Sequence, residues 1–77
     1  MSKHYRNERL IKAVGTRLRL IREELKMTQE DVAFQRDIYL TNIENGYTNI
    51  TIGKLVELCD LYKISMNEFI KGLSKYD

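Results

Sequence analysis

The feature that most constrains this chain is the spacing of its apolar residues, which recur every three or four positions near the amino terminus. Side chains at that spacing share one face of an α-helix, so the pattern predicts an amphipathic helix over residues 7–25. Its apolar stripe is formed by Leu10, Val14, Leu18, Ile21 and Leu25. Gly15 lies within the same helix, where glycine costs up to about 1 kcal/mol relative to alanine. We therefore expect another segment to pack closely at Gly15.

Capping residues and a glycine divide the rest of the chain, which contains no proline, into four further helices. Thr28, Thr51 and Ser65 each stand ahead of a helical pattern, where a hydroxyl accepts a free backbone N–H group. Ser65 and Glu68 also have the spacing of a capping box, and Gly46 suits the left-handed residue past a helix end. The sequence predicts an all-α fold, a compact five-helix domain over residues 1–77 with residues 1–6 frayed. The expected helices span about 7–25, 28–35, 37–45, 51–62 and 65–74.

Length and composition limit the classes of function that fit. Seventy-seven residues form one small domain with one apolar core, which leaves hardly any room for an enclosed active-site cleft. Cys59 and His4 are the single cysteine and histidine, so an intrachain disulfide is impossible and no metal or nucleophile site is expected. No apolar run approaches the ~20 residues of a membrane span, and no signal-peptide core is present. We expect a cytoplasmic protein that is not an enzyme, with no cofactor, metal, small-molecule ligand or membrane contact.

The charges are distributed unevenly along the chain. The net charge is +2, but residues 1–27 carry a net +5 and residues 28–77 a net −3. A basic first helix could lie along a phosphate backbone, because phosphate neutralisation supplies most of the sequence-independent affinity for DNA. The same charges fit an ordinary solvated helix face equally well.

A series of short motifs extends from about Val14 to Phe69. It consists of Ile21-Arg22, Met27-Thr28-Gln29-Glu30-Asp31-Val32-Ala33, Tyr39 to Gly46, Asn49-Ile50-Thr51, Leu55, Leu58 and Ile64-Ser65. In this order and spacing the motifs resemble the phage repressor and Cro-like helix-turn-helix family, often called the XRE family. The resemblance implies a DNA-binding domain whose second and third helices form the helix-turn-helix. Within this family, the resemblance slightly favours the controllers of restriction-modification systems.

The resemblance also implies roles for particular residues. The third helix should enter the DNA major groove, and the residues expected at base edges are Arg36, Asp37, Ile38, Thr41 and Asn42. Asn42 is the best candidate because its amide can bond adenine N6 and N7 together. The residues expected at the DNA backbone are Thr28, Gln29, Tyr47, Thr48, Asn49 and Lys54. Gln29 could instead be plain helix surface and Asn49 only a turn residue, whereas Arg22 and Glu44 match a structural salt bridge.

The chain departs from the family pattern between its two central helices. Family members usually place about eight residues where this chain has only five, between Ala33 and Tyr39. Because three residues are nearly one helical turn, their loss leaves the apolar positions on roughly the same face of the helix. Either helix 2 ends early and helix 3 follows at once, which we favour, or the two fuse into one helix that a second chain must complete as a domain-swapped dimer.

The last expected helix carries more apolar residues than one small core needs. They are Met66, Phe69, Ile70 and Leu73, which we expect at a twofold dimer interface, with simple core closure as the alternative. The sequence therefore predicts a homodimeric regulator that binds double-stranded DNA at a palindromic operator and controls its own gene. The alternative is a helical protein-interaction module on the same scaffold, with impaired DNA reading.

Overall fold

The computed structural model describes residues 7–76, with side chains through Ser74. Within this range the prediction of an all-α fold is confirmed. The elements are, in order, α1 (Glu8–Glu24), α2 (Gln29–Arg36), α3 (Thr41–Glu44), α4 (Ile52–Tyr62), α5 (Met66–Gly72) and the 3₁₀ turn η1 (Leu73–Tyr76). The expected fraying of residues 1–6 lies outside the described residues. No helix between residues 7 and 76 is long and apolar enough to cross a membrane.

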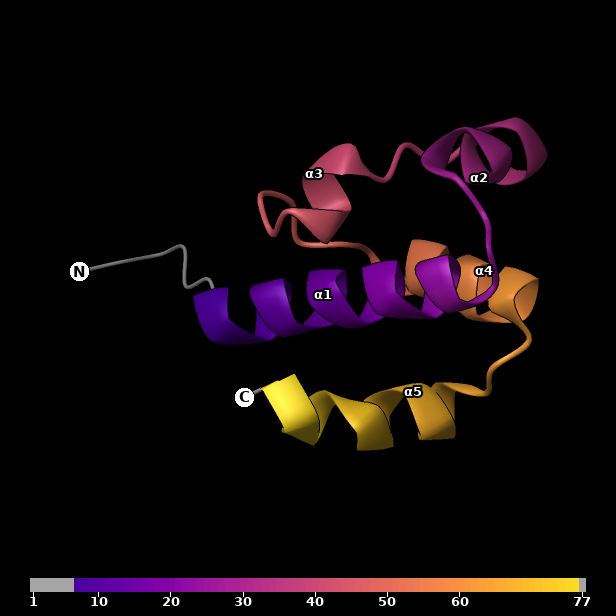
Figure 1. The fold of residues 1–77 in the computed structure, drawn as a ribbon. Helices are drawn as coiled ribbons and strands as arrows, with labels where there is room; N and C mark the ends of the chain where they lie inside the picture. The colour runs from indigo at the N-terminus through magenta and orange to yellow at the C-terminus, as the bar shows by residue number, and fades with distance from the viewer. Residues whose placement is uncertain (1–6, 77) are drawn as a thin grey trace.

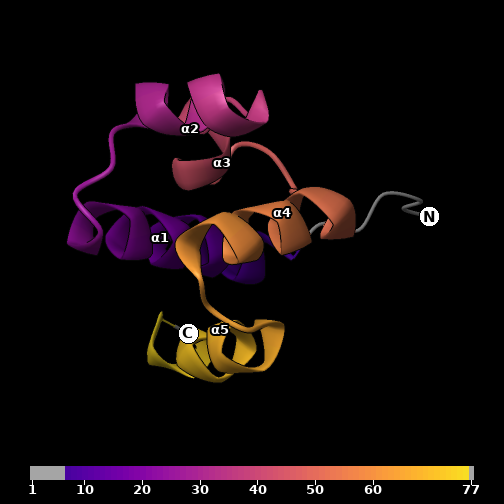
Figure 2. The same ribbon diagram turned by 90° about the vertical axis from the view of Figure 1, so that its right-hand side faces the viewer.

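The helices are arranged in three layers. α1 and α4 lie side by side in the middle, α2 and α3 lie together on one side of them, and α5 lies on the other (Figure 1; Figure 2). η1 continues α5 beneath α1 and contacts it. The α2–α3 pair therefore forms an outer layer, facing away from the carboxyl-terminal helix.

All layers meet in one apolar core. Its largest fully buried side chains are Leu18, Val32, Ile38, Leu40, Leu58 and Phe69. The face that α1 turns to this core includes Ile11, Gly15, Leu18 and Arg22. The predicted stripe was wrong at both ends, since Leu10 and Leu25 are 44% and 46% exposed. The reason is that α3 packs against α1 at Gly15 and Arg22, which rotates the buried face away from the most apolar line of side chains.

Gly15 lies where α1 and α3 touch. A Cβ atom at Gly15 would meet the carbonyl oxygen of Glu44 at 2.9 Å and would lie closer still to the carbonyl oxygen of Ile43. Real Cβ atoms do not approach backbone oxygens so closely, so any side chain at this position would push the two helices apart. The close packing expected from the sequence is thereby confirmed.

The hydroxyl caps form as predicted. Thr51 Oγ1 accepts a hydrogen bond from the backbone N–H of Lys54 over 3.2 Å, and Ser65 Oγ accepts one from Glu68 over 3.1 Å. At Thr28 a full capping box is present. Thr28 Oγ1 accepts from the N–H of Asp31 over 3.0 Å, and Asp31 Oδ2 accepts from the N–H of Thr28 over 2.8 Å. These local bonds fix the starts of α2, α4 and α5.

The shortened segment leaves α2 and α3 as separate helices, so the fused-helix alternative is wrong. Asp37 adopts a left-handed conformation with φ of 55° and ends α2 at Arg36. The predicted start of helix 3 at residue 37 is also wrong, because α3 begins only at Thr41 and contains four residues. In this chain a non-helical linker over residues 37–40 therefore separates an eight-residue α2 from a four-residue α3. Gly46 follows α3 with φ of 78°, as expected.

Three of the four apolar residues near the carboxyl terminus serve the core of this chain. Phe69 is fully buried, and Met66 and Leu73 pack against the same core. Phe69 cannot lie at a dimer interface, because α1 and α4 already cover it, so that expectation is corrected in favour of core closure. Ile70 alone among the four is strongly exposed, at 56%.

Candidate nucleic-acid interface

A buried ion pair joins α1 to α3. Arg22 Nε donates to Glu44 Oε2 over 2.8 Å, and Arg22 Nη2 donates to Glu44 Oε1 over 3.0 Å. Arg22 Nη1 donates to the carbonyl oxygen of Met27 over 2.7 Å, which ties down the turn between α1 and α2. The hydrogen bond to Glu44 raises the pKa of Arg22, and burial acts in the opposite direction. The structure thus brings together the two residues expected to form a structural salt bridge.

Gln29 extends this network to α2. Its Nε2 donates to Glu44 Oε1 over 2.9 Å, and its Oε1 accepts a hydrogen bond from Thr41 Oγ1 over 3.0 Å. The amide expected at a DNA phosphate is therefore already bonded within the chain, with one N–H of its NH₂ group left for a further acceptor. A hydrogen bond therefore joins the first residue of α2, Gln29, to the first residue of α3, Thr41.

Three of the five residues expected at base edges do not lie on α3. Arg36 is the last residue of α2 and pairs with Asp60 of α4 over 3.4 Å. Asp37 forms the left-handed turn. Ile38 is only 2% exposed, so its expected contact with a base is wrong. The expectation failed because α3 starts four residues later than the sequence pattern indicated. Thr41 and Asn42, by contrast, lie on α3 and are exposed.

Sequence reasoning missed Tyr39. The residues on either side of it, Ile38 and Leu40, are buried, whereas Tyr39 is 74% exposed. Its neighbours point into the core, and the phenol ring projects outward beside the start of α3. Its hydroxyl donates to Asp37 Oδ1 over 3.2 Å. The available signal was a tyrosine between two aliphatic residues, Ile38 and Leu40. It indicates an outward-facing ring only once this segment is known to be a linker and not part of a helix.

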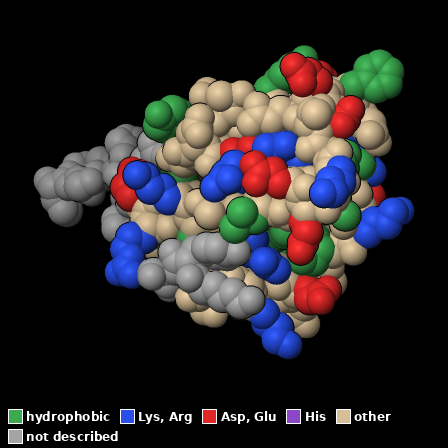
Figure 3. Space-filling model, in the orientation of Figure 1, with side chains coloured by type: hydrophobic (Ala, Val, Ile, Leu, Met, Phe, Trp, Pro, Cys, Tyr) green, Lys and Arg blue, Asp and Glu red, His purple; other side chains and the backbone are tan. Residues whose placement is uncertain are grey.

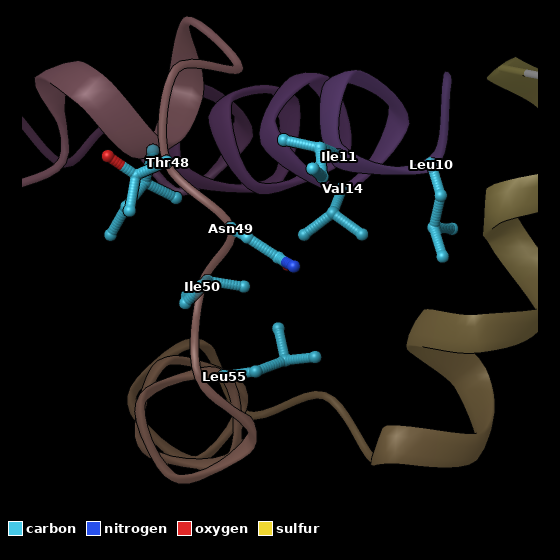
Figure 4. A pocket seen from close by; sticks show the side chains of 8 residues that line it. Leu10, Ile11, Val14, Thr48, Asn49, Ile50 and Leu55 are labelled. Carbon is cyan, nitrogen blue, oxygen red and sulfur yellow. The ribbon is translucent and has the colours of Figure 1, made fainter. Parts of the chain in front are cut away.

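The residues expected at the DNA backbone lie at the start of α2, in the connection from α3 to α4 and in the first turn of α4. Thr28 uses its hydroxyl as acceptor in the cap of α2. Tyr47, Thr48 and Asn49 are exposed in the connection from α3 to α4, and Lys54 is exposed in the first turn of α4. Figure 4 shows the Thr48 hydroxyl pointing away from the space between α1 and α4, and Asn49 pointing into it. Thr48 is therefore better placed than Asn49 to meet a phosphate.

Two hollows flank these segments. One is an apolar cavity of about 110 Å³ between α1, the α3–α4 connection and α4, and Asn49 lies on its wall (Figure 4). The other is a groove of about 240 Å³ between α2 and the start of α3. It is lined by Gln29, Glu30, Ala33, Tyr39, Leu40 and Thr41. We call it the α2–α3 groove.

Several of the basic residues in α1 are used inside the chain. Arg17 Nε donates to the carbonyl oxygen of Phe69 over 2.9 Å, and its guanidinium lies 5.4 Å from the centre of the Phe69 ring. Arg19 pairs with Glu23 over 3.4 Å. Figure 3 shows Lys and Arg side chains mixed with Asp and Glu over this part of the surface. These contacts favour the solvated helix face over a continuous phosphate-binding track along α1.

A family model described as a helix-turn-helix domain matches residues 15–75. The chain belongs to this helix-turn-helix family. The family is typical of XRE-like regulators, which bind DNA and are not generally enzymes. No curated protein and no solved structure gives a significant match to the chain. In this helix-turn-helix protein, α2 and α3 are the two helices of the motif.

Proposed function

We propose that this helix-turn-helix protein is a sequence-specific transcriptional regulator that binds a palindromic operator as a homodimer and controls its own gene. The proposal rests above all on the exposed side chains of Thr41 and Asn42 at the start of α3. The bonds of Gln29 and Glu44 hold this short helix in place, and a fixed recognition element is what base reading requires.

Asn42 is the residue that we assign to base reading. Its amide carries one acceptor and two donor hydrogens, which match N6 and N7 of adenine in the major groove. Phosphate contacts fall to Lys54 and Thr48. The acidic residues Glu30 and Asp37 repel phosphates, so the DNA backbone should pass beside the α3–α4 connection.

The small size of α3 supports the proposed homodimer. Four helical residues extend about 6 Å along the helix axis, so one copy can touch few base pairs. Two copies on half-sites about 34 Å apart would double the number of bases read. Ile70, half-exposed on α5, is the residue that we assign to the contact between copies.

Fluorescence anisotropy tests the proposal. The labelled duplex upstream of the protein's own gene is titrated beside a scrambled duplex, at two salt concentrations. We expect preference for the upstream duplex and weaker binding at the higher salt, since phosphate contacts release counterions. Asn42→Ala should reduce the preference by about 1–3 kcal/mol. Asn67→Ala, an exposed asparagine on α5, is the matched control and should leave it intact. Equal, weak binding to both duplexes would contradict the proposal.

A protein-interaction module is the second candidate function. Phe34 of α2 is 91% exposed, and large aromatic residues at that exposure are typical anchors of protein interfaces. A hydrophobic side chain stands clear of the surface at the α2 end in Figure 3. Under this alternative, Phe34→Ala should weaken a protein partner, and Asn42→Ala should have no effect on DNA.

A further inference from the structure

The α2–α3 groove has apolar walls and lies beside the recognition helix. Ala33 and the buried Leu40 contribute apolar surface, and the exposed ring of Tyr39 stands at one side. The groove belongs to the outer layer formed by α2 and α3 (Figure 1; Figure 2). A DNA duplex that meets the start of α3 would therefore also meet this groove.

The two hydroxyl groups at the groove are already hydrogen-bonded within the chain. Thr41 Oγ1 donates to Gln29 Oε1, and the Tyr39 hydroxyl donates to Asp37 Oδ1. The surface left for a ligand is chiefly the exposed Tyr39 ring and the partly exposed methyl group of Ala33, since Leu40 is only 1% exposed. Such a surface suits a small apolar group better than a hydrogen-bonding one.

Charge indicates which part of DNA could enter. Glu30 lines the groove and Asp37 holds the Tyr39 hydroxyl beside it. Two carboxylates repel the phosphate backbone, so a base edge is favoured over a phosphate at this position. The one apolar group that DNA presents in its major groove is the 5-methyl group of thymine.

We propose that the α2–α3 groove takes the 5-methyl group of a thymine, and that Tyr39 is the residue that contacts it. This inference rests on the proposed function, because it needs a DNA duplex at the start of α3. It assigns to Tyr39 a part of base reading that the four-residue helix α3 is too short to supply.

The test begins with a randomised 20-base-pair duplex library, from which the full-length protein selects preferred sites. Each thymine of a selected duplex is then replaced by deoxyuridine, which removes only the 5-methyl group. We expect affinity to fall about fourfold at one thymine per half-site, the factor for one buried methyl group. In Tyr39→Ala this thymine-to-uracil difference should vanish, whereas Tyr39→Phe should retain it.

Phe34→Ala is the matched control, because it removes an exposed aromatic ring that does not line the groove. It should leave the thymine-to-uracil difference unchanged. Circular dichroism of each variant checks that the helices are intact. If selected sites bind but every thymine tolerates uracil, the groove assignment is wrong and the proposed function stands. If the library yields no preferred site, both are wrong.

Discussion

Replacing Glu44 with glutamine should cost this protein much of its stability. The Glu44 carboxylate accepts two hydrogen bonds from Arg22 and one from Gln29. Its side chain is 2% exposed and that of Arg22 is 10% exposed. Glutamine has nearly the same shape but only one oxygen, and its NH₂ group would face one of these donors. The buried guanidinium would then keep only the half-exposed Glu23 carboxylate, 4.0 Å away, as a countercharge.

The size of the effect follows from that geometry. Breaking a buried ion pair by changing one partner costs about 3–5 kcal/mol, because the other charge is left uncompensated. A domain of this length has a total stability of roughly 4–12 kcal/mol. The single variant should therefore be partly unfolded near physiological temperature. The double variant Arg22→Met with Glu44→Leu removes both charges and should lose less than either single variant.

Urea unfolding followed by circular dichroism measures these differences. Asp60→Asn is the control, since its 3.4 Å pair with Arg36 lies at the surface, where the Asp60 side chain is 75% exposed; exposed pairs contribute at most about 1 kcal/mol. A loss below about 1 kcal/mol in Glu44→Gln, equal to that of the control, would refute the argument that this ion pair anchors α3.

Three further predictions concern stability alone and use the same assay. Gly15→Ala should destabilise the protein by at least about 1–3 kcal/mol, because its methyl group would displace the backbone of α3. Gly53→Ala, which has open space around it, should instead stabilise the protein by up to about 1 kcal/mol. Equal effects of the two substitutions would contradict this prediction. Burial raises the pKa of Tyr62 to about 12, so the unfolded chain loses that proton first, near pH 10. Stability should therefore fall by up to about 3 kcal/mol between pH 10 and 12. Tyr62→Phe should flatten that decline and also gain about 1 kcal/mol at neutral pH, because the hydroxyl has no partner in the described part of the chain. Lys63→Gly should stabilise by about 0.5 kcal/mol, since Lys63 is left-handed with φ of 59°; a loss would show that the lysine side chain contributes more than the strain.

The helix starts could be predicted from the sequence because capping is local chemistry. Thr28, Thr51 and Ser65 each bond a backbone N–H group three residues ahead, so the signal and its effect lie in the same short window. Gly46 ends α3 for the same kind of reason. Close packing at Gly15 could be inferred because a glycine inside a helix is unfavourable without a compensating contact.

The rotation of α1 and the partners of its charges could not be predicted in this way. Arg17 bonds a carbonyl group 52 residues further along the chain, and no local pattern reports such a contact. Counted from the sequence alone, Arg17 adds to a basic surplus that suggests phosphate binding. In the fold it holds α5 against α1. The exposure of Leu10 and Leu25 also depends on contacts distant in the sequence, because the helix that packs on α1 decides which side of α1 is buried.

The length of α3 shows how core packing overrides helix continuity. Continuing α2 through residue 40 would gain one more helical turn, but it would carry Ile38 and Leu40 out of the core, where they are 2% and 1% exposed. Burying two such side chains contributes about 3–6 kcal/mol, which outweighs a turn of helix and the left-handed strain at Asp37.

The resulting α3 is too short to be stable by itself. It keeps its position through Glu44 at its end and Thr41 at its start, both bonded to Gln29. If the proposed function is right, base discrimination then depends on the buried Arg22–Glu44 pair, which holds α3 through Gln29 without itself touching DNA. Changes at Gln29 should reduce sequence preference at temperatures where the rest of the fold is still intact.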